Sequence, residues 1–146
     1  MNYKILKICL DDLSWSKSED VQSKAIKHLI DNITDEFIPS LIKDTGKDCW
    51  DNAIEIIKNI GITRTEFAIP WLIFLLKDLT WPGSLESINI LKEYNNEKLI
   101  PFFDRALEQA DLEGDTMWIS GIEFVISQLN IDINKLINSE ILRRAD

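Results

Sequence analysis

A repeat of 31 residues limits the folds open to this chain more than any other feature of its sequence. An isoleucine-proline pair recurs at that spacing, and three columns of apolar residues keep the same period. The pairs are Ile38-Pro39, Ile69-Pro70 and Ile100-Pro101, and the columns are Leu10, Leu41, Leu72 and Phe103; Ile26, Ile57, Ile88 and Ile119; and Leu29, Ile60, Leu91 and Ile122. Several independent columns that share one period indicate a repeat architecture.

Within each unit the apolar residues are spaced by three and four, as in Ala53, Ile56 and Ile60, whereas the alternation typical of strands is absent. We predict an all-α chain with helices at about residues 2–13, 18–32, 35–44, 49–60, 66–79, 83–94, 97–109, 115–129 and 132–144. This gives about four antiparallel helix pairs and a C-terminal helix. The Ile-Pro entry and the aliphatic second helix are similar to HEAT repeats in a short form, so we expect the pairs to stack into a solenoid.

The expected helix ends follow the same period. We predict helix caps at Thr34, Thr65 and Asn96, because their side-chain oxygens accept hydrogen bonds from free backbone N–H groups and an acid follows each of them closely. Four glycines fall where helices should end or turn, namely Gly46, Gly61, Gly83 and Gly114. The prolines of the repeat lie in the first turns of their helices, and each would bend a helix that begins earlier.

Composition limits the classes of partner. The chain has 146 residues, 45% of them hydrophobic, which suits one domain over residues 1–146. A net charge of −9 argues against nucleic acid and anionic membranes as partners and permits a basic one. Lysines interrupt the apolar stretch at Met1 to Leu10 too often for a signal peptide, so we expect a cytoplasmic protein. Cys9 and Cys49 are expected to be buried, reduced thiols.

One segment resembles a known family. The chain reads Leu75-Leu76-Lys77-Asp78-Leu79-Thr80-Trp81-Pro82-Gly83 there, followed by Leu99-Ile100-Pro101 and by a helix with Trp118. This is similar to small bacterial HEAT-like domains of unknown function marked by a Leu-x-Asp-x-x-Trp-Pro segment, and the resemblance covers about residues 67–144. It implies a helical-repeat fold and no established activity. By analogy at the level of the fold, small acidic HEAT-like proteins include bacterial immunity proteins, which neutralise toxins by binding them.

Few residues are candidates for catalysis. His28 is the single histidine, and its place within a predicted helix favours a surface role. Asp48, Asp51 and Glu55 share one helix face near Trp50 and could together hold a divalent ion. Acids near a helix N-terminus also stabilise the helix dipole, and we favour that interpretation. We therefore expect no catalytic residue, cofactor or metal.

Four tryptophans mark a candidate binding surface. They stand at or near the starts of the second helices, each close to acidic residues. We expect most of these indoles to pack between units and one or two to be exposed anchors, since tryptophan is enriched in binding hot spots. The predicted partner-binding residues are Asp11, Asp12, Trp15, Asp48, Trp50, Asp51, Glu55, Asp78, Trp81, Glu86, Asp115 and Trp118.

These features favour a non-enzymatic protein-binding module, most concretely a bacterial immunity protein that binds a basic toxin domain through this surface. A general HEAT-like scaffold or adaptor is the alternative, followed by a carboxylate-dependent hydrolase. A toxin gene directly upstream would favour the immunity protein over the scaffold. A buried cluster around Asp48, Asp51 and Glu55 would favour the hydrolase.

Overall fold

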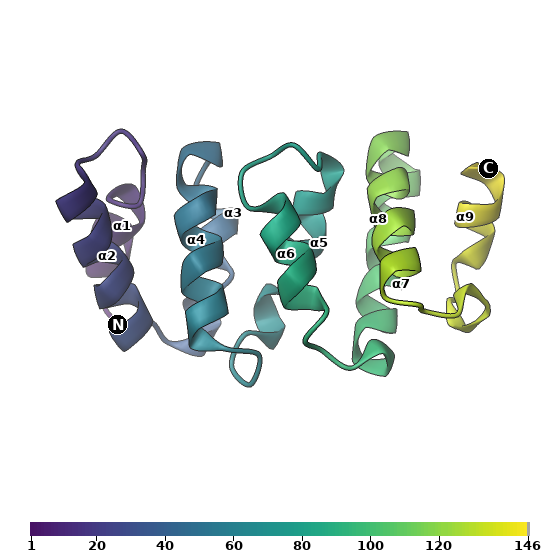
Figure 1. Cartoon of the computed structure of the whole chain (residues 1–146), viewed down its shortest axis with the longest axis horizontal. Helices are drawn as coiled ribbons and strands as arrows, with labels where there is room; N and C mark the ends of the chain where they lie inside the picture. Colours follow the sequence, from purple (N-terminus) through teal and green to yellow (C-terminus); the bar gives the residue numbers. More distant parts are fainter. Residues whose placement is uncertain (146) are drawn as a thin grey trace. The chain divides into compact units, whose positions relative to one another are not determined.

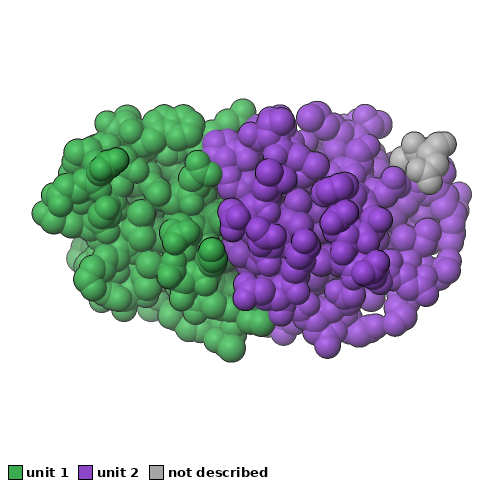
Figure 2. Space-filling model, viewed as in Figure 1, with its two compact units in different colours: residues 1–71 green, residues 72–146 purple. Residues whose placement is uncertain are grey.

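The computed structural model describes residues 1–145 of the chain. All regular secondary structure in this range is helical, which confirms the predicted all-α class. Within the same range, no helix combines the length and the apolar character needed to cross a membrane. The chain divides into two compact units, residues 1–71 and 72–146, which Figure 2 shows in green and purple. The division falls inside a helix, α5 (Ile69–Phe74), and not in a linker.

Unit 1 consists of α-helices and 3-10 helices (η) joined by short connections. Its elements are α1 (Tyr3–Asp11), α2 (Glu19–Asn32), η1 (Asp35–Phe37), α3 (Ser40–Lys43), α4 (Lys47–Ile60) and η2 (Glu66–Ala68), followed by the start of α5. α2 packs against both α1 and α4, and α3 packs against α4. The α1–α2 connection and the beginning of α4 lie at the same end of this unit, the upper end in Figure 1.

Unit 2 is arranged around α8. Its elements after α5 are η3 (Leu75–Lys77), α6 (Ser84–Leu91), α7 (Asn96–Glu113), α8 (Thr116–Gln128), η4 (Ile133–Lys135) and α9 (Ser139–Ala145). α8 packs against α7, η3 and α9. At Gly121 this packing is so close that a Cβ atom would lie 2.1 Å from the backbone oxygen of Leu76. A residue without a side chain is therefore required at this position of α8.

The periodic apolar columns lie in the core. The column that begins with Leu10 is buried at all four of its positions, up to Phe103. The other two columns are buried as well, except at Ile26 and Ile60, which are half-buried. The isoleucines that precede the prolines are buried at Ile38 and Ile69, and Ile100 is half-buried. The 31-residue period in the sequence is therefore a period of core positions.

Several of the predicted helices, above all the first helix of each 31-residue repeat, are less regular than predicted. The segment expected as one helix at 35–44 is η1 followed by α3, and the segment at 66–79 is η2, α5 and η3. The C-terminal helix expected at 132–144 is likewise divided, into η4 and α9. Pro39 and Pro70 stand at the start of α3 and α5, where a missing N–H costs no intrahelical bond. Pro101 instead lies inside α7, which begins at Asn96, so this helix continues through its proline.

None of the three predicted caps acts as a cap. Thr34 and Thr65 occupy the N-cap positions of η1 and η2, but neither side chain accepts a capping hydrogen bond. The hydroxyl of Thr65 donates to the carbonyl of Gly61 instead, at 3.1 Å. In α7 the cap is Asn95 and not Asn96, and its side chain accepts from the N–H of Glu97.

Candidate functional site

Trp15 is a large aromatic side chain presented to solvent in unit 1. It lies in the connection between α1 and α2 and is 61% exposed. Its backbone N–H donates a hydrogen bond of 3.0 Å to the carbonyl of Asp48, in the first turn of α4. Residues 33 positions apart are thus brought together at one end of the unit, and the backbone of Trp15 is fixed to the beginning of α4.

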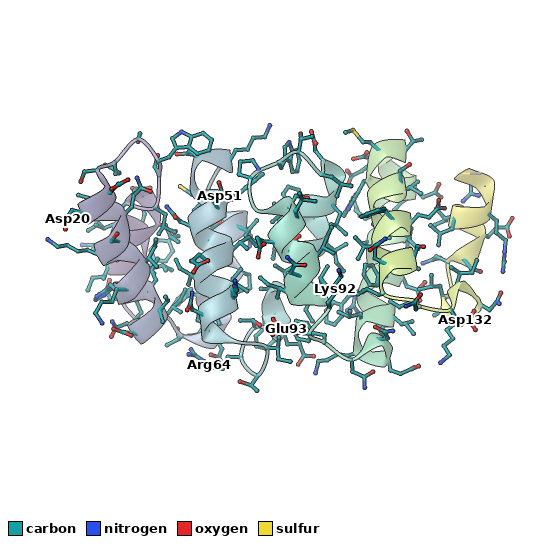
Figure 3. The ribbon with its side chains drawn as sticks, viewed as in Figure 1. Asp20, Asp51, Arg64, Lys92, Glu93 and Asp132 are labelled. Atoms are coloured by element: carbon teal, nitrogen blue, oxygen red, sulfur yellow. The ribbon has the colours of Figure 1, made fainter. Side chains whose placement is uncertain are left out.

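Acidic residues lie on the two helix ends that adjoin this connection. Asp11 ends α1 and is exposed, Asp48 is half-buried, and Asp51 is exposed one helical turn after Asp48. Figure 3 shows Asp51 near the beginning of α4 and Arg64 beyond the opposite end of that helix. Asp12 forms an ion pair of 3.8 Å with Lys17, which partly neutralises it. We refer to Trp15, Asp11, Asp48 and Asp51 as the Trp15 surface.

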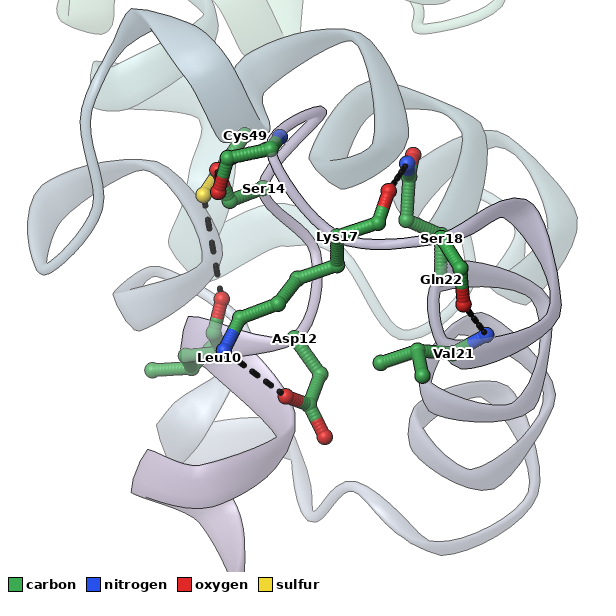
Figure 4. Close-up of polar contacts among 9 residues, drawn as sticks. Leu10, Asp12, Ser14, Lys17, Ser18, Val21, Gln22 and Cys49 are labelled. Carbon is green, nitrogen blue, oxygen red and sulfur yellow. Dashed lines mark hydrogen bonds and ion pairs between the residues drawn. The ribbon is translucent and has the colours of Figure 1, made fainter.

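The thiols beneath this surface are inert. Cys9 and Cys49 are free and buried, and the Sγ of Cys49 lies 3.7 Å from the carbonyl oxygen of Leu10 (Figure 4). Burial raises the pKa of Cys49 to about 11, and the negative charges of Asp48 and, to a smaller extent, Asp11 add to this effect. Burial likewise raises the pKa of Cys9. Both side chains therefore carry a protonated thiol at neutral pH and are poor nucleophiles.

Trp50 and Trp118, predicted as partner-binding residues, are core residues. They are 7% and 6% exposed. The indole N–H of Trp50 donates to the carbonyl of Ile42 at 3.2 Å, and that of Trp118 donates to the carbonyl of Ile73 at 3.0 Å. Their rings and polar atoms are already satisfied within the fold, so neither side chain is an exposed anchor. The expectation that most of the indoles pack internally holds for these two.

The predicted residues at the start of unit 2 also have structural partners. Asp78 accepts hydrogen bonds at Oδ1 from the backbone N–H and the hydroxyl of Thr80, at 2.8 and 2.6 Å. The half-buried ring of Trp81 packs against Phe74, with 5.7 Å between the ring centroids. The Leu-x-Asp-x-x-Trp-Pro segment therefore forms a turn followed by an aromatic contact.

Asp115 belongs to a group of polar contacts that connects the start of α8 to η3 and to the end of α7. It caps α8 by accepting the N–H of Trp118 at 2.9 Å, and it lies 3.9 Å from the ammonium of Lys77. Lys77 also pairs with Glu113 at 3.0 Å and stands 4.6 Å above the ring of Trp118. Hydrogen bonds from Gln109 and then from Lys77 lower the pKa of Glu113. These contacts within the chain give the Asp115 carboxylate a structural role that requires no binding partner.

The remaining predicted carboxylates contact their own helices. Glu55 accepts from the side chain of Asn59, and Glu86 accepts from the side chain of Asn89, each at 3.1 Å. Among the described residues no group of three or more His, Cys, Asp or Glu side chains is placed to hold a metal ion, and this covers Asp48, Asp51 and Glu55.

A groove of about 650 Å³ lies in unit 2 between α7 and the C-terminal segment. Its lining carries both signs of charge, and several of these groups already have partners. Arg144 pairs with Asp111 at 3.2 Å, and Asp104 accepts the backbone N–H groups of Ile137 and Asn138. None of the predicted partner-binding residues lines this groove.

Sequence reasoning missed Asn52, which holds the connection that carries Trp15. Its side-chain amide donates to the carbonyl of Leu13 at 2.8 Å and to Oε1 of Gln22 at 2.9 Å. One signal was available, because asparagine disfavours helix interiors and Asn52 adjoins the buried stripe of α4 that contains Cys49 and Ala53.

No protein-family model, curated protein or solved structure matches the chain. The assignment of a site consequently depends on the molecule's own geometry. Of the twelve predicted residues, Trp15, Asp11 and Asp51 are exposed on the Trp15 surface and Asp48 is half-buried there, whereas the buried tryptophans and the capping carboxylates have partners within the fold.

Proposed function

We propose that this protein is a non-enzymatic binding module that neutralises a basic protein toxin, in the manner of a bacterial immunity protein. The observation that carries this proposal is the exposed side chain of Trp15, whose backbone N–H is bonded to the carbonyl of Asp48 in the first turn of α4, the helix that also carries the exposed Asp51. On a chain with a net charge of −9, this is an aromatic anchor with an acidic rim.

We further propose that the helices form a short HEAT-like solenoid of about four pairs and a C-terminal helix. Two observations support this arrangement. The apolar columns with a 31-residue period are core positions, and several pairs of consecutive helices pack on one another, namely α1 with α2, α3 with α4, α7 with α8 and α8 with α9. Repeats of this kind bury their apolar faces by stacking and leave an extended surface for partners.

The proposed surface suits a partner rich in lysine and arginine. Tryptophan supplies a large contact area with only two side-chain torsions to fix, and it is common among the residues that dominate binding energy. Carboxylates around such an anchor accelerate the encounter with a basic surface and add specificity more than raw affinity. A lysine or arginine of the partner could also lie over the indole as a cation–π contact.

Protection from a toxin tests this function. The product of the gene directly upstream is co-expressed with this protein, and growth is measured for the wild type, Trp15→Ala and Phe67→Ala. Phe67 is a matched control because it is an aromatic residue of unit 1 with 64% exposure and lies outside the Trp15 surface. We expect protection by the wild type and Phe67→Ala and loss of protection with Trp15→Ala. A neighbouring product that is no toxin, or full protection by Trp15→Ala, contradicts the proposal.

The role of charge is tested by reversing it at one residue. Asp51→Lys and Glu36→Lys change the net charge equally, but Glu36 lies in η1, outside the Trp15 surface. We expect Asp51→Lys to slow association with the toxin and to weaken its dependence on salt, whereas Glu36→Lys behaves nearly as the wild type. Equal effects of the two variants would show that only the total charge matters and would contradict an acidic binding surface at α4.

A further inference from the structure

The connection that carries Trp15 is held on both sides of that residue. Two residues before Trp15, the carbonyl of Leu13 accepts a hydrogen bond of 2.8 Å from the side-chain amide of Asn52. Two residues after it, the carbonyl of Lys17 accepts a hydrogen bond of 2.8 Å from the side-chain amide of Gln22 (Figure 4). Surface connections are usually the most mobile parts of a fold, so two such contacts on so short a segment call for a reason.

The two contacts are linked to each other. The amide nitrogen of Asn52 also donates to Oε1 of Gln22 at 2.9 Å, so both of its hydrogens have acceptors and its orientation is fixed. The same bond fixes Gln22, whose own amide nitrogen is then directed to Lys17. A continuous series of hydrogen bonds thus runs from Leu13 through Asn52 and Gln22 to Lys17.

The connection is also held by a buried side chain and by a backbone hydrogen bond to α4. Leu13 is fully buried, and the N–H of Trp15 is bonded to Asp48 of the same helix that carries Asn52. α4 therefore holds the connection through two residues one turn apart. With the backbone constrained at Leu13, Trp15 and Lys17, the indole projects from a segment of defined conformation.

From this geometry we infer that Asn52 is a positioning residue for the binding site, which presents Trp15 in its binding conformation before the partner arrives. The inference rests on the proposed function. Preorganised groups bind more tightly because less conformational freedom is lost on association. Loss of the Asn52 hydrogen bonds then weakens binding although no contact residue changes, by about tenfold if the freed segment must be ordered again.

Asn52→Asp is the test variant. It keeps the size of the side chain and removes both hydrogen-bond donors, and its added negative charge would by itself favour a basic partner. Asn59→Asp is the matched control, because Asn59 lies on the same helix, is exposed and donates only to Glu55 among the described residues. Any loss of affinity peculiar to Asn52→Asp thus comes from the donors and not from the charge.

Fluorine NMR of protein labelled with 5-fluorotryptophan reads the position of each indole. The chain contains five tryptophans, and Trp15→Phe identifies the Trp15 signal. We expect Asn52→Asp to shift or sharpen the Trp15 signal while the signals of the buried Trp50 and Trp118 stay in place, and Asn59→Asp to change none. An unchanged Trp15 signal overturns the inference, and so does a change in all five signals, which would show a general structural role.

The dissociation constant for the toxin completes the test. We expect Asn52→Asp to weaken binding about tenfold and Asn59→Asp to leave it unchanged. A shifted Trp15 signal with unchanged affinity would overturn the inference, provided that Trp15→Ala does weaken binding. If Trp15→Ala also has no effect on affinity, the proposed function itself has failed, and the two failures are thereby distinguished.

Discussion

The indole N–H of Trp118 donates a hydrogen bond of 3.0 Å to the backbone carbonyl of Ile73. Trp50 makes the same kind of bond to Ile42, which lies 31 residues before Ile73 in the repeat. The acceptors therefore follow the period of the chain, whereas the donors, 68 residues apart, do not. Trp50 of α4 and Trp118 of α8 thus occupy different positions of the repeat but donate to equivalent carbonyls, in α3 and α5.

Replacing Trp118 by phenylalanine should destabilise the fold. The variant loses part of a buried ring, leaves the Ile73 carbonyl without its indole donor and weakens the contact with Lys77, so we expect a loss of about 2 kcal/mol in the free energy of unfolding. Urea denaturation measures this loss. Trp15→Phe is the control, with an expected change within about 0.5 kcal/mol because the residue is exposed. Equal losses for the two variants would contradict their different placement.

Gly121→Ala should be costly for a different reason. A Cβ atom at this position would lie 2.1 Å from the backbone oxygen of Leu76, and a backbone atom cannot rotate away as a side chain does. We expect α8 to shift and the protein to lose about 2 kcal/mol or more of stability, despite the better helix propensity of alanine. Ser120→Ala, at an exposed position of the same helix, should be neutral or slightly stabilising in thermal denaturation. A neutral Gly121→Ala would show that α8 does not approach η3 this closely.

Asp104 should control the attachment of the C-terminal segment. Its buried carboxylate accepts the N–H groups of Ile137 and Asn138, at 3.1 and 2.9 Å. Asp104→Ala leaves both donors without this partner, and we expect a loss of about 2–3 kcal/mol. In Asp104→Ala, the backbone amides of residues 137–145 should exchange their hydrogens faster than in the wild type. Glu108→Ala, one turn further along α7 at an exposed position, should leave this exchange rate unchanged. Unaltered protection in Asp104→Ala would contradict this role.

Stability should fall between pH 9 and pH 11 because of Cys49. Its thiol ionises near pH 9 in the unfolded chain but only near pH 11 in the native protein. Below pH 9 the thiol is protonated in both states and the native state keeps its full stability. Above pH 9 the unfolded chain loses the proton first, so the native state loses about 2–3 kcal/mol by pH 11. Cys49→Ala should lack this part of the pH dependence, and equal slopes for the two proteins in urea titrations would contradict the raised pKa.

The sequence allowed the helical class and the core to be predicted because both depend on periodic apolar residues. The columns at Leu10 and its equivalents lie in the core, and most helix bounds are met within a few residues. The 3-10 turns around Pro39 and Pro70 were missed, since a proline in a first turn fits either one continuous helix or a turn followed by a helix.

The site was less predictable, because the local sequence around a tryptophan near a helix start does not determine whether its side chain is exposed or buried. Trp15 and Trp50 have similar acidic neighbours in sequence, yet one is exposed and the other is buried against Ile42. Asp115 likewise has the sequence neighbours expected of a partner-binding residue, but its carboxylate accepts the N–H of Trp118 and caps α8. Contacts between distant segments, such as Asn52 with Leu13, cannot be read from local pattern at all.

The affinity of the complex tests the central claim most directly. Isothermal titration calorimetry of the wild type and of Trp15→Ala against the toxin encoded upstream gives the two dissociation constants. We predict that Trp15→Ala weakens binding by about thirtyfold, the effect of removing a hot-spot residue that contributes about 2 kcal/mol. Equal dissociation constants for the two proteins would show that the Trp15 surface is not the binding site.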